Sequence, residues 1–290
     1  MNGILVVDKP AGWTSHDVVA KLRGIYREKR IGHAGTLDPM ATGVLVVFLG
    51  RATRAVELCE NDEKEYVAGL RLGTVTNTQD ITGQVLETHP AAVSETELAA
   101  ALERFTGPQS QVPPMYSAVK IGGRKLYELA RKGQSVERRP RDITIHELEK
   151  IGTVDGDILL RVRCSKGTYV RTLCHDMGVW LGCGGCLSSL RRTRAGRFSL
   201  EDTVALEQVQ AAKEQGTHED LLRPVDSLFL DLPELHLAGL AETRLRNGGE
   251  FPAEVSDGRY RVYGEGGEFL LLGQVTDGTL KTVKSFFEVK

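Results

Sequence analysis

The stretch GHAGTLDPMATG, residues 32–43, holds a single carboxylate, Asp38, among small side chains. An acid that transfers protons as half of a pair needs a second carboxylate, and this stretch contains no second acid, no cysteine and no set of metal ligands. A carboxylate that acts alone can serve as a nucleophile or stabilise positive charge. Aspartate before proline is also a common turn residue, because its side chain can bond to the backbone two residues on. The spacing by itself favours the turn and leaves the chemical interpretation open.

The motifs of several enzyme classes are missing from the sequence. It contains no GxxxxGK[ST] loop, no HExxH motif, no GxSxG motif and no GxGxxG motif after a strand. The cysteines of CGGC, residues 183–186, have no second CxxC or HxxxH pair to complete a structural zinc site. His33 is the one histidine in the Asp38 stretch, and a lone histidine is more often a structural residue than a ligand. We therefore expect no metal site.

The composition indicates an ordinary globular protein. The 290 residues are 41% hydrophobic and 26% charged, with a formal net charge of −2. The longest apolar run, VLVVFL at 44–49, is far shorter than a membrane span and predicts a buried strand. The first residues do not match a signal peptide, because Asp8 and Lys9 follow a short apolar run. Five cysteines, an odd number, indicate reduced thiols. We expect a cytoplasmic protein without a membrane partner.

Basic residues gather in two segments although the net charge is close to zero. Eight lie between 120 and 141, against two acids, and eight lie between 161 and 197, against one acid. Two such segments suggest one positive face that binds a polyanion. A solvated surface with acids opposite in space would give the same pattern, so charge alone favours neither interpretation.

Hydrophobic spacing predicts a mixture of helices and strands. Ser15 can cap a helix over 16–28, and alternation predicts a half-buried strand over 65–73. SETE at 94–97 is a capping box that begins another helix. The elements follow no strict strand–helix–strand rhythm, which favours an α+β fold with a largely antiparallel sheet. From residue 231 onward, short strands with glycine turns predict a small β module.

Several stretches resemble, in order along the chain, the signatures of the tRNA pseudouridine-55 synthases, which modify the T-arm uridine of transfer RNA. They are GHAGTLDPMATGVLVV, KEYVAGLRLGTVTNTQDITGQV, QVPPMYSAVKIGGRKLYELARKG, CSKGTYVRTLCHDMGVWLGCGG with LSSLRRTRAGRF, and LRPVDSLFLDLP with the tail after it. The resemblance implies a pseudouridine synthase fold at 1–230, with helices flanking a mixed, largely antiparallel central sheet. It also implies a thumb-like RNA-binding segment at about 106–142 and a small barrel-like PUA RNA-binding domain at 231–290.

The same resemblance implies an isomerase. Its members flip the T-loop uridine at position 55 of tRNA out of the fold and move the glycosidic bond from N1 to C5, which yields pseudouridine. No electrons are transferred and no group is added, so no cofactor is expected. The short N-terminus fits a bacterial-type member that recognises the tRNA T-arm as a monomer, without a guide RNA or protein partner. The alternative is a non-catalytic tRNA-folding chaperone that uses the same cleft.

Two charged residues are implied to carry the reaction. Asp38 corresponds to the catalytic aspartate. Burial alone would protonate such a group, and a neighbouring cation opposes this. Arg171, in GTYVRT, corresponds to that cation, and its planar guanidinium can hold a carboxylate in one orientation. Without the resemblance, Arg171 would be predicted to be a solvated helix charge.

Other residues are implied to contact RNA. Tyr66, Tyr169 and Leu190 correspond to residues that contact the target base, and Tyr66 would otherwise be predicted to lie in the core. His33 corresponds to the histidine that meets the RNA near the flipped nucleotide. The predicted RNA-binding patch consists of basic residues: Arg54, Lys120, Arg124, Lys125, Arg131, Lys132, Arg191 and Arg192.

Overall fold

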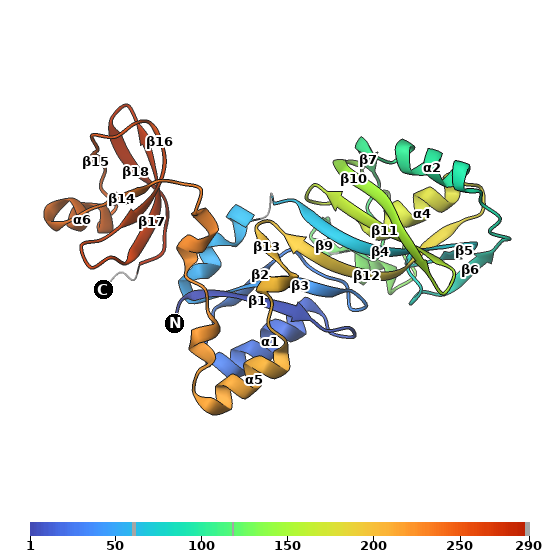
Figure 1. Ribbon diagram of the computed structural model, residues 1–290, viewed down its shortest axis with the longest axis horizontal. Coiled ribbons are helices and arrows are strands. Elements are labelled where there is room, and N and C mark those ends of the chain that lie inside the picture. The colour runs from blue at the N-terminus through green and yellow to red at the C-terminus, as the bar shows by residue number, and fades with distance from the viewer. Residues whose placement is uncertain (60–61, 118, 288–290) are drawn as a thin grey trace.

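A computed structural model of the chain describes residues 1–59, 62–117 and 119–287 and contains two main β-sheets (Figure 1). The strands are β1 (Gly3–Lys9), β2 (Ile31–Ala34), β3 (Thr42–Leu49), β4 (Lys64–Leu72), β5 (Thr74–Thr76), β6 (Val85–Thr88), β7 (Gly107–Gln111), β8 (Lys120–Ile121), β9 (Arg124–Lys125), β10 (Arg141–Val154), β11 (Asp157–Cys164), β12 (Gly185–Ala195), β13 (Phe198–Ser199), β14 (Glu234–His236), β15 (Phe251–Pro252), β16 (Gly258–Tyr263), β17 (Phe269–Thr276) and β18 (Thr279–Ser285). The α-helices are α1 (Ser15–Tyr26), α2 (Glu95–Arg104), α3 (Leu126–Ala130), α4 (Val170–Trp180), α5 (Leu206–Gln215) and α6 (Gly239–Arg246), and the 3-10 helices are η1 (Gly50–Cys59), η2 (Leu200–Asp202), η3 (His218–Leu221) and η4 (Val225–Phe229).

The larger sheet has nine strands and follows the order β1-β3-β12-β4-β11-β10-β7, with β2 paired to β3 and β13 to β12. Its pairs are antiparallel except for β3 and β12, which run parallel over a short register. In Figure 1, α1 and α5 lie together beside the β1–β3 end, and α4 packs against β12 and β4. The predicted α+β fold with a mixed, largely antiparallel sheet is confirmed.

The local predictions agree with the elements that form. The apolar run at 44–49 is the buried part of β3, and the predicted strand at 65–73 coincides with β4. Ser94 caps α2 in the predicted capping box with Glu97. One core cluster joins β3, β4 and β12 to residues of α1 and α4, so both halves of the sheet share a continuous interior.

The start of α1 differs from the prediction by one residue. Thr14, not Ser15, is the cap: its Oγ1 accepts a hydrogen bond from the Asp17 backbone N at 3.1 Å. Either hydroxyl residue can cap a helix, so the sequence did not distinguish them. Ser15 is buried instead, and its Oγ accepts a hydrogen bond from the Leu37 backbone N at 2.9 Å. That contact ties α1 to the loop that carries Asp38.

The second sheet confirms the predicted change to short strands near residue 231. Its five strands follow the order β14-β16-β17-β18-β15, and only β14 and β16 are parallel. Aromatic rings join it to the rest of the chain: Phe269 lies 6.2 Å from Phe229 of η4 and 5.4 Å from Phe286, between ring centroids. The Tyr263 hydroxyl also donates to Asp226 Oδ2 at 2.7 Å. The assignment of this second sheet to a PUA domain stays a prediction.

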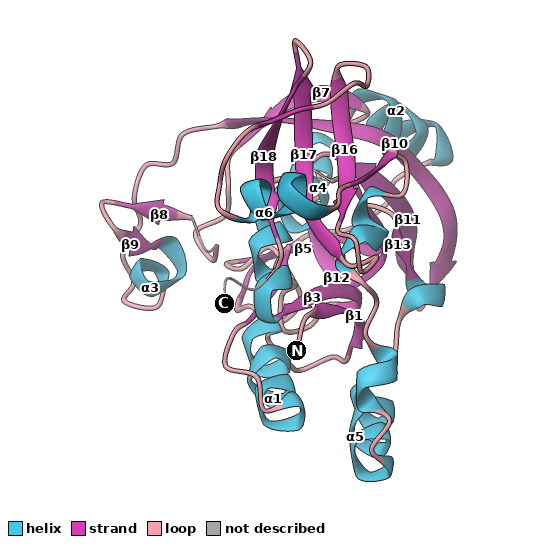
Figure 2. Cartoon of the chain, turned by 90° about the vertical axis from the view of Figure 1, so that its left-hand side faces the viewer, coloured by secondary structure: helices cyan, strands magenta, loops and turns pink. Residues whose placement is uncertain are grey.

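The predicted thumb segment leaves the main sheet after β7. The β8–β9 hairpin and α3 stand apart from both sheets in Figure 2. Residue 118 of this segment, and residues 288–290 of the predicted tail domain, lie outside the described residues. Within the described ranges, no helix combines the length and the apolar character that a membrane span requires.

Candidate active site

The loop between β2 and β3 holds Asp38 in place through contacts on both sides. The Pro39 carbonyl accepts a hydrogen bond from the Gly12 backbone N at 2.8 Å and lies 3.3 Å from Lys9 Nζ. The Asp38 carbonyl accepts one from the Ala41 backbone N at 3.0 Å. The loop is therefore a turn, but in the described part of the chain the Asp38 carboxylate accepts hydrogen bonds only from Arg171. The turn interpretation does not account for its side chain.

Arg171 holds this carboxylate from the first turn of α4. Its Nη2 donates to Asp38 Oδ1 at 3.2 Å, and its Nε lies 2.8 Å from Oδ2 without the alignment of a hydrogen bond. Nη2 also donates to the Tyr116 carbonyl at 2.9 Å, and Nη1 donates to the Thr78 carbonyl at 3.1 Å. Only 5% of the Arg171 side chain is exposed, so it is not a solvated helix charge. Contacts from three separate segments orient the guanidinium.

Asp80 is a second acid that the sequence prediction missed. Its Oδ2 lies 3.5 Å from Arg171 Nη1, and only 6% of its side chain is exposed. Its Oδ1 accepts hydrogen bonds from the Thr82 backbone N at 3.0 Å and from the Thr78 hydroxyl at 2.9 Å. The sequence around Asp38 contains no second acid, but the fold brings Asp80 to the same guanidinium. The expectation that Asp38 has no neighbouring acid is therefore wrong. The threonines on either side of Asp80 in TQDIT were the available signal, because they can satisfy a buried carboxylate.

The charges around Asp38 act in opposite directions. Burial raises its pKa, and the Asp80 charge adds to this, whereas Arg171 and Lys9 lower it; the net direction is upward. A third of the side chain, 34%, nevertheless stays exposed. The carboxylate is therefore held from one side by protein and is open to a ligand from the other.

Lys9 is another charged group that the prediction did not include. It is buried at the end of β1, where its Nζ donates to the carbonyls of Trp13 at 2.5 Å and Pro10 at 2.9 Å. Burial lowers the pKa of Lys9 to about 8, against the opposing effect of Asp38. Its main structural role is to join the end of β1 to the Asp38 loop.

Tyr66 and Leu190 lie on the neighbouring strands β4 and β12. Both are nearly buried and belong to the same core cluster as Leu37 and Ala41 of the Asp38 loop. Burial raises the pKa of Tyr66, and the Asp38 charge contributes in the same direction. The predicted core position of Tyr66 and a position beside Asp38 are thus compatible.

Tyr169 and His33 approach from two other elements. Tyr169 is the residue before α4, and its backbone N and carbonyl both bond to the buried amide of Gln111, at 2.8 and 3.1 Å. His33 lies on β2, with its ring 5.6 Å from that of His16 between centroids. Burial lowers the pKa of His33 to about 4, so it is neutral near pH 7. The base contacts predicted for these residues stay predictions.

Arg192 does not belong to an exposed RNA-binding patch, which corrects the prediction. Only 1% of it is exposed. Its Nε donates to the Val44 carbonyl at 2.7 Å and its Nη2 to the Gly35 carbonyl at 2.9 Å, one on each side of the Asp38 loop. A Cβ at Gly43 would lie 2.2 Å from the Arg192 carbonyl, so only glycine permits this approach of β3 and β12. Arg192 therefore supports the Asp38 loop by bonding to the backbone on both sides of it.

The second basic segment, at 161–197, is largely neutralised by acids. Five of its arginines form ion pairs with acids elsewhere in the chain: Arg161, Arg163, Arg171, Arg191 and Arg197. Arg191, predicted for the RNA patch, bonds to both carboxylate oxygens of Asp8, at 3.2 and 2.8 Å. The prediction of one continuous positive face is therefore wrong for this segment.

The first basic segment remains positively charged. None of its eight basic residues forms an ion pair with another described residue. Those predicted for the RNA patch are exposed or half-buried: Lys120, Arg124, Lys125, Arg131 and Lys132. Arg54, the remaining member of the predicted patch, lies on η1 and donates to Ser285 Oγ of the second sheet at 2.7 Å. Among the described residues, no group of three His, Cys, Asp or Glu side chains is placed to share a metal ion.

Comparison with known proteins agrees with these arrangements. Residues 23–170 match the family described as "TruB family pseudouridylate synthase (N terminal domain)", and residues 171–230 match "tRNA pseudouridylate synthase B C-terminal domain". The tRNA pseudouridine synthase B of Clostridium kluyveri is 40% identical over an alignment of 295 residues. The alignment covers 99% of this chain and 100% of that protein. That of Azoarcus sp. is 41% identical over 282 residues, covering 97% and 93%. The chain belongs to the TruB family of pseudouridylate synthases.

Solved structures support the TruB-family fold. A chain from the "Structure of H/ACA RNP bound to a substrate RNA containing 2'-deoxyuridine" superposes with a TM-score of 0.73 at 26% identity, covering 99% of this chain and 85% of that one. A chain from the "Crystal Structure of a Cbf5-Nop10-Gar1 Complex" gives 0.73 at 28% identity, covering 98% and 85%. The predicted pseudouridine synthase fold is confirmed.

Asp80→Asn is expected to lower the pKa of Asp38, because it removes a negative charge that disfavours ionisation of that carboxylate while keeping the side-chain shape. The titration of Asp38 can be followed by NMR on protein with 13C-labelled aspartate carboxyl groups. Asp155→Asn, on the exposed turn between β10 and β11, is the matched control and should leave Asp38 unchanged. An unchanged or raised pKa of Asp38 in Asp80→Asn would contradict the conclusion that the Asp80 charge raises the pKa of Asp38.

Arg192→Met in this TruB-family chain should lower the free energy of unfolding by about 2–4 kcal/mol, because two loop carbonyls lose a buried charged donor. Urea denaturation measures the change. Arg194→Met, two residues along β12 and exposed, is the control and should change stability by less than about 0.5 kcal/mol. Equal effects of the two substitutions would show that Arg192 does not support the loop.

Proposed function

We propose that this TruB-family chain converts the T-loop uridine of tRNA, at position 55, to pseudouridine. The observation that carries the proposal is the Asp38–Arg171 pair, in which a partly exposed carboxylate is held against a buried guanidinium. Curated relatives that align along nearly the whole chain are named tRNA pseudouridine synthase B, which agrees with this activity. The proposed chaperone alternative would not require this ion pair.

The chemistry suits a single carboxylate. The bond from ribose C1′ to uracil N1 breaks, a bond from C1′ to C5 forms, and the hydrogen on C5 is lost while N1 gains one. Asp38 can act as the nucleophile, by adding to the ring or by attacking C1′, and is released when the new bond is complete. Asp80 shares Arg171 with Asp38, so it adjusts the charge of the pair rather than serving as a second acid–base group.

The target base would be held by the apolar surroundings of Asp38. Tyr66 and Leu190 come from adjacent strands, Tyr169 immediately precedes α4, and His33 lies on β2. In our proposal the ring of Tyr66 stacks on the uracil, its hydroxyl assists the proton transfer at C5, and His33 meets the RNA beside the flipped nucleotide. A neutral His33 can occupy such a position without a charge to desolvate.

A T-loop uridine must leave its stack to reach Asp38. Extrusion of a base costs a few kcal/mol, which contacts to the RNA backbone have to offset. The basic residues of the thumb segment at 106–142 form no ion pairs with other described residues, which suits them to this role. The Tyr116 carbonyl connects the first part of the segment to Arg171. We propose that the thumb cations contact the phosphates of the T-arm.

The remaining assignments belong to the same proposal. Residues 1–230 form the catalytic domain and 231–290 a PUA-like RNA-binding domain. The protein acts on tRNA as a monomer without a guide RNA, a cofactor or a metal. All five cysteines are free and buried, which suits a reducing cytoplasm.

Asp38→Asn should reduce pseudouridine formation to below about one thousandth of the rate of the unchanged protein, because the amide cannot act as the nucleophile. Tritium release from a T-arm hairpin with uridine labelled at C5 measures turnover without added RNA or protein. Binding of the hairpin should stay within a few-fold, and Asp155→Asn should retain full activity. Turnover near that of the unchanged protein in Asp38→Asn would refute the assigned role.

Activity should fall with decreasing pH as Asp38 becomes protonated. Because burial raises the pKa of Asp38, the ionised and active form is lost at a higher pH than for an exposed aspartate, whose pKa is about 3.9. The pH dependence of kcat/KM on the same hairpin checks this, with ultraviolet melting at each pH to control for the RNA fold. An acid limb at or below the ordinary aspartate value would contradict the prediction.

A further inference from the structure

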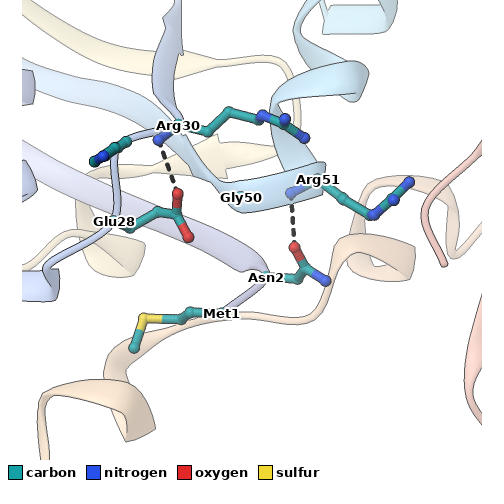
Figure 3. Close-up of a pocket in the computed structure, with 7 residues that line it drawn as sticks. Met1, Asn2, Glu28, Arg30, Gly50 and Arg51 are labelled. Atoms are coloured by element: carbon teal, nitrogen blue, oxygen red, sulfur yellow. Dashed lines mark hydrogen bonds between the residues drawn. The ribbon is translucent and has the colours of Figure 1, made fainter. Parts of the chain in front are cut away.

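A second basic site lies at the end of the sheet opposite to Asp38. It is an open pocket of about 360 Å³ whose lining includes Asn2, Glu28, Lys29, Arg30 and Arg51 (Figure 3). The pocket lies where β1 begins and β3 ends, whereas the Asp38 loop enters the other end of β3. The eight residues of β3 separate the two sites by about 25 Å.

Backbone contacts bring the cations of this pocket together. The Gly50 backbone N donates to the Arg30 carbonyl at 2.7 Å, and the Arg51 backbone N donates to Asn2 Oδ1 at 2.6 Å. Gly50 has a φ of +61°, and a Cβ there would lie 2.0 Å from the Met1 carbonyl, so only glycine permits this turn. The Arg30 and Arg51 side chains extend to the same side of the pocket in Figure 3.

The positive charge of this pocket is not cancelled locally. Of the lining cations, Lys29 and Arg30 are exposed and Arg51 is half-buried. Neither these three nor the exposed Arg27, which precedes the lining residues in the sequence, forms an ion pair with another residue in the described ranges. Glu28 is the acid in the lining, and its carboxylate accepts a hydrogen bond from the Arg30 backbone N at 2.8 Å. Three lining cations around one backbone-bonded acid make a site for an anion.

The neighbouring second sheet does not supply such charge. Between 234 and 287 there are eight acids and six basic residues. Four of the six form ion pairs with acids: Arg246, Arg261, Lys281 and Lys284. The partner of Lys284 is Glu57 of η1, which places this sheet close to the pocket. In the described part of the second sheet, Arg244 and Arg259 are thus the cations without an ion pair, whereas residues 27–30 and 51 hold four such cations.

We infer that this pocket binds the phosphate backbone of the RNA helix that continues beyond the T-arm of the substrate. The inference rests on the proposed function, because a T-arm uridine at Asp38 sets where the rest of the tRNA runs. Phosphates are the anions such an RNA presents at regular spacing, and arginine binds them with paired donors. In this inference only the continuing helix contacts the pocket, about 25 Å from the Asp38 end of β3, and the isolated T-arm hairpin does not.

The test compares the dissociation constants of full-length tRNA and of the isolated T-arm hairpin, measured by filter binding. The double variant Arg30→Ala/Arg51→Ala should bind full-length tRNA about tenfold more weakly and bind the hairpin as the unchanged protein does. Loss of two phosphate contacts should also reduce the slope of log Kd against log salt by about 2 for the full-length tRNA. Arg30→Lys/Arg51→Lys keeps the charges and should restore most of the affinity.

Two results would overturn the inference: full-length tRNA binding that the alanine variant leaves unchanged, or an equal loss for tRNA and hairpin. The readout is binding, so it does not depend on turnover. If the unchanged protein binds tRNA but releases no tritium from C5-labelled uridine, the proposed function fails while the result on this pocket stands.

Discussion

The guanidinium of Arg171 is the group on which the candidate site depends. It is almost wholly buried, and it faces the carboxylates of Asp38 and Asp80 and two backbone carbonyls. A buried cation that loses its partners is strongly destabilising, so these groups hold one another in place. The proton affinity of Asp38 is consequently set by burial and by at least two neighbouring charges. An isolated aspartate in a turn would have neither constraint.

Strand β12 connects this ion-pair group to the rest of the fold. Its Leu187 carbonyl accepts a hydrogen bond from the Ile81 backbone N at 2.9 Å, which fixes the segment next to Asp80. Leu190 lies in the core beside the Asp38 loop, and Arg192 bonds to the carbonyls on both sides of that loop. One continuous strand therefore positions both acids and one apolar contact. Such support from a regular element holds a site more rigidly than loops alone do.

The distribution of paired and unpaired charge explains how a chain with a net charge of −2 can present polyanion-binding surfaces. Arginines on and near the main sheet are mostly paired with acids, and Arg192 is buried against carbonyls. Among the described residues, two groups of cations without ion pairs lie in the thumb segment at 120–141 and around the pocket at residues 27–30 and 51. Local potential, not total charge, determines where an RNA backbone is attracted.

The sequence by itself determined the local structure and the family. Apolar alternation indicated β4, the apolar run indicated β3, and the capping box located the start of α2, because these patterns depend on residues close together in the chain. Only the tertiary structure decided which charges are buried and what they face. Asp38 and Arg171 are 133 positions apart, and Arg192 bonds to a carbonyl 157 positions away. The sequence prediction missed Asp80 and placed Arg192 in an exposed RNA-binding patch. Desolvation and ion pairing depend on neighbours in space, which spacing along the chain does not contain.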